Sequence, residues 1–172
     1  MKKSNVLLGI FALAALGFSS CSSDDDGNSG TLAGTYELDQ VNIGTAIDFD
    51  QDGDTNTDLT KESGCYDSGK ITLNSDGTLT FVKSYVLVDE DLGTSTCASN
   101  TFTGTWLIQG QTGSTVVVEA TYVDANDDEI MVQLTKQGDK LRYTDVFGQY
   151  PNRNGEGGAI YSTGSVEYVF DK

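Results

Sequence analysis

The sequence predicts an all-β protein, folded as an eight-stranded antiparallel up-and-down barrel. Apolar and polar residues alternate with a period of two in eight consecutive segments, and no stretch shows sustained helical periodicity. The 20 glycines and the single proline suit short strands joined by tight turns. Consecutive strands with hairpin connections can close into a barrel, and a closed barrel leaves no open sheet edge.

The predicted strands follow one another after residue 31, and their inward faces are the apolar ones. Their ranges are 32–43, 70–73, 78–88, 101–109, 115–123, 129–135, 140–147 and 159–170. The alternation is clearest in the third to sixth strands, whose apolar faces carry Leu79, Phe81, Tyr85 and Leu87; Phe102, Gly104, Trp106 and Ile108; Val116, Val118, Ala120 and Tyr122; and Ile130, Val132 and Leu134. The interior of such a barrel either fills with side chains or holds one small ligand.

The connections between these strands alternate in length. The long ones are residues 44–69, 89–100, 124–128 and 148–158, and the short ones are residues 74–77, 110–114 and 137–139. Because alternate connections of a meander lie at opposite ends, the long loops share one end of the barrel. They carry 14 acidic residues, against two, Asp76 and Asp139, in the short turns. The sequence therefore predicts one closely trimmed end and one acidic rim.

Composition limits the function classes open to this chain of 172 residues, a length that suits one domain. It has 26 acidic and 10 basic residues, for a net charge of −16, so we expect no binding to nucleic acid. The absence of histidine excludes Ser-His-Asp and Cys-His mechanisms and histidine-based zinc sites. We expect a monomeric, non-enzymatic protein without catalytic residues.

The N-terminus consists of Lys2 and Lys3, an apolar run over residues 6–18, and small residues before Cys21. Residues 1–20 thereby resemble a bacterial lipoprotein signal peptide, which implies that Cys21 is lipidated and anchors the exported protein in the outer membrane. We expect residues 21–30 to form a flexible acidic tether, and their sequence resembles the surface-export signal of Bacteroidota lipoproteins. A secreted protein with Cys21 in a disulfide is the alternative, and the periplasmic face and the cell surface both stay open as locations.

Cys65 and Cys97 fall in the first and second long connections, and so at the same end of the barrel. In an oxidising compartment we expect them to form a disulfide. A catalytic thiol is the alternative, but it needs a nearby base or cation, and there is no histidine to supply one.

Four segments carry a resemblance over residues 31–170: Leu32–Leu38, Asp48–Cys65, Ile71–Phe81 and Gly104–Trp106. They resemble the lipocalin-like lipoproteins of Bacteroidota, which implies a lipocalin-like barrel domain over residues 31–172. That family usually has tryptophan after the Gly-Thr pair of the first strand. Here Tyr36 stands in its place and keeps an aromatic plug for the barrel base.

The first long connection contains an aspartate-rich loop, residues 48–59. Acids at its positions 1, 3 and 5 and glycine at position 6 match the first half of an EF-hand calcium loop. Position 12 is Leu59 rather than glutamate, so Asp58 or Glu62 would close the site. The sequence predicts a structural calcium ion (Ca²⁺), with a solvated acidic loop as the alternative; the candidate ligands are Asp48, Asp50, Asp52, Asp54, Asn56 and Asp58.

Nine aromatic residues lie on the predicted strands and either fill the core or form a ligand wall: Phe81, Tyr85, Phe102, Trp106, Tyr122, Tyr143, Tyr161, Tyr168 and Phe170. The leading hypothesis is a cell-envelope barrel that binds a small apolar or amphipathic molecule at residues that the sequence does not single out. The alternative is a surface structural or adhesion module with a filled barrel that contacts a protein or glycan.

Overall fold

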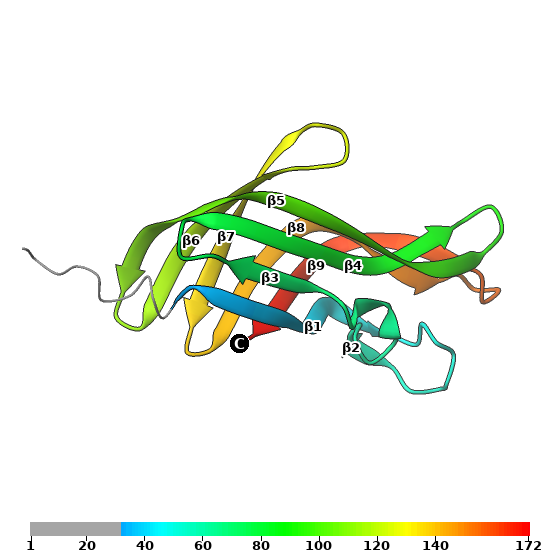
Figure 1. Ribbon diagram of the computed structural model, residues 1–172. Helices are drawn as coiled ribbons and strands as arrows, with labels where there is room; N and C mark the ends of the chain where they lie inside the picture. The colour runs from blue at the N-terminus through cyan, green and yellow to red at the C-terminus, as the bar shows by residue number, and fades with distance from the viewer. Residues whose placement is uncertain (1–31) are drawn as a thin grey trace, which may run out of the picture.

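The computed structural model describes residues 32–172, so the predicted signal peptide, Cys21 and the tether lie outside the described residues. The described part is almost entirely β-structure (Figure 1). Its elements are β1 (Gly34–Ile47), β2 (Asn56–Asp58), the 3-10 turn η1 (Gly64–Tyr66), β3 (Lys70–Leu73), β4 (Thr78–Asp89), β5 (Thr94–Thr112), β6 (Thr115–Val123), β7 (Glu129–Gln137), β8 (Lys140–Arg153) and β9 (Ala159–Asp171).

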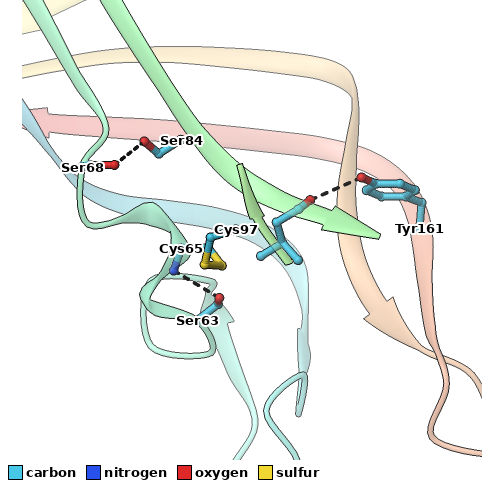
Figure 2. The surroundings of a disulfide bond; sticks show 7 residues. Ser63, Cys65, Ser68, Ser84, Cys97 and Tyr161 are labelled. Atoms are coloured by element: carbon cyan, nitrogen blue, oxygen red, sulfur yellow. Dashed lines mark hydrogen bonds between the residues drawn. A yellow bond between two sulfur atoms is a disulfide. The ribbon is translucent and has the colours of Figure 1, made fainter. Parts of the chain in front are cut away.

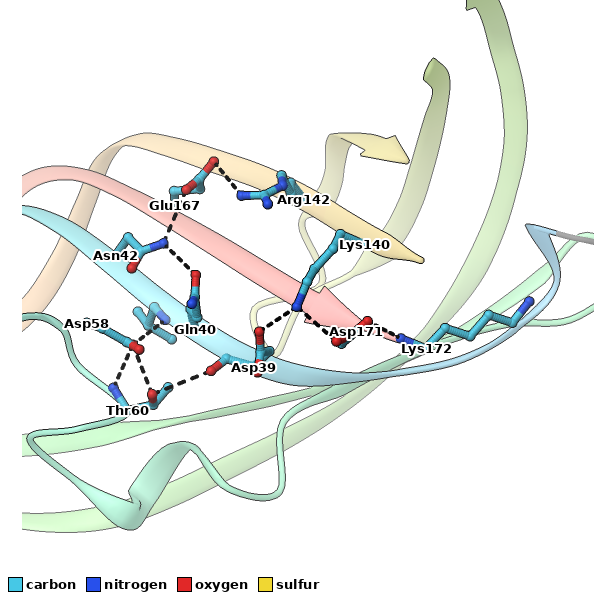
Figure 3. Close-up of polar contacts among 11 residues, drawn as sticks. Asp39, Gln40, Asn42, Asp58, Thr60, Lys140, Arg142, Glu167, Asp171 and Lys172 are labelled. Atoms are coloured by element: carbon cyan, nitrogen blue, oxygen red, sulfur yellow. Dashed lines mark hydrogen bonds and ion pairs between the residues drawn. The ribbon is translucent and has the colours of Figure 1, made fainter. Parts of the chain in front are cut away.

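The strands confirm the predicted fold class. Strands β1 and β3 to β9 pair in chain order, each antiparallel to the next, and β9 returns to pair with β1 and close an eight-stranded barrel. The short strand β2 lies outside this ring, on the edge of β1 beyond the pairing with β3. On the outer surface of the closure, Lys140 bridges Asp39 at 2.7 Å and Asp171 at 2.9 Å, joining β8, β1 and β9 (Figure 3).

The prediction that residues 89–100 and 148–158 are loops was wrong, because most of each segment is β-strand. β5 begins at Thr94 and pairs with β4 in unbroken register, while β8 continues to Arg153. The segment 94–100 has no apolar alternation, but threonine and serine tolerate extended backbone, and β4 supplies the ladder. The β4–β5 and β8–β9 hairpins therefore form long extensions at the mouth of the barrel, the end opposite the tight turns (Figure 1).

The barrel base is closed and filled. The tight turns 74–77, 113–114 and 138–139 lie at this end, opposite the connections 48–69, 90–93, 124–128 and 154–158. Tyr36 is fully buried there, and its hydroxyl donates a 2.7 Å hydrogen bond to the Leu32 carbonyl. Around it pack Ile71, Leu79, Phe81, Trp106, Leu134, Leu141 and Phe170.

A second core occupies one side of the mouth. Phe49, Leu59 and Tyr66 of the first long connection pack there against β1, β4 and β9. Their partners are Val41, Ile43, Ile47, Val86, Val88, Ala159 and Val166. The long connection thus covers the mouth on the β1–β4–β9 side and leaves the side of β6 to β8 uncovered by this core.

The barrel wall is weakest between β7 and β8. These strands share three residue pairs, from Thr135–Arg142 to Gln137–Lys140, all near the base. Nearer the mouth the tip of the β6–β7 hairpin projects away from the barrel (Figure 1). There β8 bulges between Asp145 and Gly148. Pro151, which has no N–H to donate, lies where β8 has only β9 as a partner among the described strands.

Candidate functional site

An open cavity of about 1240 Å³ lies where β7 and β8 separate. It is lined from both sides of the gap and from the barrel interior, by Phe102 of β5, Tyr122 of β6, Ile130 and Val132 of β7, Tyr143 of β8 and Tyr168 of β9, among others. Pockets for small organic molecules measure roughly 300–1,000 Å³, so this cavity has room for one.

Two stacked aromatic pairs form much of its apolar wall. The rings of Tyr143 and Tyr168 lie 4.6 Å apart between centroids with 11° between their planes, and those of Phe102 and Tyr122 lie 5.1 Å apart at 25°. The first pair follows from register, because Tyr143 and Tyr168 are directly opposite in the β8–β9 ladder. In the second pair, Tyr122 is opposite Gly104 in the β5–β6 ladder, and Phe102 lies two residues before that glycine. Of the nine strand aromatics, some therefore fill the base and others line the cavity.

The hydroxyls of Tyr122, Tyr143 and Tyr168 form no hydrogen bond with any group of residues 32–172. Tyr36 and Tyr161, by contrast, are both hydrogen-bonded to backbone. Burial raises the pKa of Tyr168 to about 12, and the Asp145 carboxylate adds to the rise. Burial likewise raises the pKa values of Tyr122 and Tyr143. All three side chains are thus neutral hydrogen-bond donors at ordinary pH, with no partner inside the described chain.

Charged groups border this aromatic wall. Asp124 accepts hydrogen bonds from the backbone of Asn126 at 2.8 Å and Asp128 at 3.0 Å, and Asp145 accepts one from Phe147 at 3.1 Å within the β8 bulge. Arg142 is paired with Glu167 at 3.6 Å (Figure 3).

A separate acidic group lies in the first long connection. Asp48, Asp50 and Glu62 each place a carboxylate oxygen within 4.8 Å of the others. Glu62 is 2 % exposed and accepts 2.7 Å hydrogen bonds from Phe49 N and Asn56 Nδ2. Asp48 Oδ1 is buried and has no hydrogen-bond partner. Because none of the ion pairs within residues 32–172 involves these three carboxylates, the triad could hold a metal ion.

The other predicted metal ligands are placed differently. Asp52 Oδ1 accepts a hydrogen bond from Asp54 N at 2.8 Å in an exposed turn, and Asp54 is exposed. Asn56 donates to Glu62. Asp58 Oδ1 accepts bonds from Val41 N at 3.1 Å and from the Thr60 hydroxyl at 2.9 Å, so it ties the connection to β1 (Figure 3). The EF-hand spacing thus identified Asp48 and Asp50. The third member of the triad is Glu62, which the sequence offered as an alternative to Asp58 for closing the site.

The predicted disulfide is confirmed. Cys65 of η1 and Cys97 of β5 are bonded, with 4.9 Å between their Cα atoms (Figure 2). Ser68 and Ser84 form a 2.8 Å hydrogen bond nearby, and the Tyr161 hydroxyl joins β9 to β4 through Val86 O at 3.3 Å and Val88 N at 3.0 Å. These links hold the covered side of the mouth together, beside the cavity.

Searches of family models, curated proteins and solved structures find no match for this chain. Among residues 32–172, no helix is long and apolar enough to cross a membrane. The cavity must therefore be interpreted from its own chemistry. Two residues in the sequence could have indicated where the cavity lies. Gly148 is at the β8 bulge, and Pro151, the single proline, is in the part of β8 that does not pair with β7.

Proposed function

We propose that this protein is a lipocalin-like binding protein, which holds a small amphipathic molecule in the cavity between β7 and β8. The observation that carries the proposal is the open cavity, whose wall combines stacked rings with tyrosine hydroxyls that have no partner among residues 32–172. The apolar surface supplies affinity and the hydroxyls supply orientation. The filled base gives these groups a rigid support.

Ligand uptake is tested with N-phenyl-1-naphthylamine, a neutral dye whose emission rises in apolar surroundings. The wild type is expected to bind it with 1:1 stoichiometry. Val132→Trp fills the cavity and should abolish uptake, whereas Leu107→Trp, at a position 51 % exposed and outside the cavity lining, should bind normally. Circular dichroism verifies that both variants are folded. Absence of uptake by the wild type, or equal uptake by folded Val132→Trp, would refute the proposal.

Calcium at Asp48, Asp50 and Glu62 is part of the same proposal. All three side chains offer hard carboxylate oxygens, which suit Ca²⁺, and Asp48 Oδ1 has no protein donor to satisfy it. A bound cation would neutralise three carboxylates that lie close together and would order the connection 48–69. Its role is structural, since the triad belongs to the segment that covers the mouth rather than to the cavity.

The lipid anchor at Cys21 completes the proposal, and it rests on the signal-like sequence of residues 1–21. An acidic tether between the lipid and Leu32 would attach to the barrel at its closed base, because β1 begins there. Fractionation of cells that express the full chain tests it. Cys21→Ala should move the protein from the membrane fraction to the soluble one, and an unchanged distribution would refute the anchor.

A further inference from the structure

We propose that the molecule held in this cavity is an amphipathic organic cation, with its apolar body on the stacked rings and its positive head beside Asp124 and Asp145. This inference rests on the proposed ligand-binding function and narrows it to one charge class.

Both acids continue the inward face of a strand that carries a stacked ring. Side chains two residues apart in a strand share a face, so Asp145 follows Tyr143 on the inner side of β8. Asp124 is the first residue after β6, two residues beyond Tyr122, and it lies in the lining of the cavity. Each carboxylate is therefore one step nearer the mouth than its ring. An elongated ligand with its apolar end inward would bring its head to these carboxylates.

The charge balance of the lining favours a cation. Neither Asp124 nor Asp145 takes part in an ion pair within residues 32–172. Arg142 is matched by Glu167, so this pair adds no net charge. Lys83, on the far wall with Tyr85, is the one basic lining residue outside an ion pair in the described chain. Two acids against one base leave the lining negative, in a chain whose net charge is −16.

The aromatic wall adds to this preference. The faces of tyrosine and phenylalanine rings are negative and attract ammonium groups within about 6 Å of the ring centroid. Asp145 lines the same cavity as Tyr122, Tyr143 and Tyr168. Burial is the main cause of the raised pKa values of these tyrosines, and the negative charge of Asp145 is a smaller cause for each. An anionic head group would be repelled by the negative charge of Asp145. The described lining residues do not form the cluster of cationic side chains that would be needed to bind an anion.

Three probes with the same twelve-carbon chain and different heads test the inference: dodecyltrimethylammonium, dodecyl maltoside and dodecanoate. Each is titrated into the full chain by isothermal calorimetry, below its micelle-forming concentration. The cationic probe is expected to bind at least about tenfold more tightly than the neutral and anionic ones at low salt. Its advantage should shrink when salt is raised from about 20 mM to about 200 mM, because screening weakens charge pairing.

Asp124→Asn and Asp145→Asn, singly and together, locate the effect. Asparagine keeps an oxygen that can accept the local backbone hydrogen bonds, so folding should persist. The double variant should lose about tenfold in affinity for the cationic probe and retain its affinity for dodecyl maltoside. Asp139→Asn is the matched control, because this acid lies in the β7–β8 turn at the opposite end of the barrel.

The outcomes separate this inference from the proposed function. If the neutral or anionic probe binds as tightly as the cation, or if Asp139→Asn acts like Asp145→Asn, the charge class is wrong while the binding function stands. If the cationic probe does not bind, the charge class is refuted, and if N-phenyl-1-naphthylamine also fails to bind, the proposed function is refuted with it. Selective loss of the cation in the double Asp variant supports them together.

Discussion

Tyr143 and Tyr168 stack face to face across the β8–β9 ladder, with 4.6 Å between their ring centroids. This pair marks the level at which the barrel changes character. On the base side, Leu141 and Phe170 are fully buried in a filled core. On the mouth side, β8 has lost its pairing with β7 and the cavity opens. The two rings therefore pack on the mouth side of the filled core and also form part of the wall of the candidate binding site.

Alkaline pH should destabilise the protein through its buried tyrosines. Burial, and secondarily Asp139, raises the pKa of Tyr36 to about 12, and burial with Asp145 raises that of Tyr168 to a similar value. Above pH 10 the unfolded chain releases phenolic protons that the folded chain retains, so the free energy of unfolding falls as pH rises from 10 to 12. For one such tyrosine the loss is about 2 kcal/mol.

Urea unfolding at pH 8, 10 and 11.5 measures this loss, and absorbance at 295 nm follows tyrosinate. Tyr168→Phe keeps the stack but removes one ionisable group, so its stability should fall less steeply with pH than that of the wild type. Equal slopes for the two proteins would contradict the assigned role of Tyr168.

Removal of the disulfide should cost about 3–4 kcal/mol, because it closes a loop spanning a sequence separation of 32. The Cys65→Ser, Cys97→Ser double variant is expected to unfold at lower urea concentration than the wild type. Dithiothreitol should shift the wild type to the same midpoint and leave the double variant unchanged. A wild type whose midpoint does not respond to reduction would count against a stabilising bond.

Calcium should raise the melting temperature of the wild type, and EDTA should reverse the rise. Glu62→Gln and Asp50→Asn remove charge from the triad and should abolish the response. Asp52→Asn is the matched control, since Asp52 lies outside the triad and an asparagine oxygen can still accept the bond from Asp54 N. Loss of the response in Asp52→Asn but not in Glu62→Gln would instead favour the EF-hand ligand set. A wild type indifferent to EDTA would refute the site.

Gly104→Ala should destabilise the barrel by about 3 kcal/mol. A Cβ at this position would overlap the backbone carbonyl of Thr121 on the paired strand, and backbone cannot move aside as a flexible side chain can. Gly110→Ala, on the same strand with open space around it, should change stability by less than about 0.5 kcal/mol. Thermal melts of both variants compare the two costs, and similar values would show that the close approach at Gly104 is unimportant.

Much of this fold could be predicted because its signals are local. Alternation in segments such as 115–123 and turn residues such as Asn74 and Gly77 specify strands and tight turns through nearest neighbours alone. The alternation of long and short connections likewise predicted that Cys65 and Cys97 lie at the same end of the barrel. Residues 94–100 and 148–153 gave no such signal, because their extended conformation depends on the partner strands β4 and β9.

By itself, the sequence determined the barrel, the polarity of its loops, the disulfide, and two of the three acids in the possible metal site. The tertiary structure alone decided that β7 and β8 part after three residue pairs, that Glu62 completes the triad, and that Asp124 and Asp145 border one cavity. The physical reason is the range of the interactions. Periodicity and turn chemistry act between neighbours in the chain, whereas the cavity depends on side chains from β4 to β9 that only the closed barrel brings together.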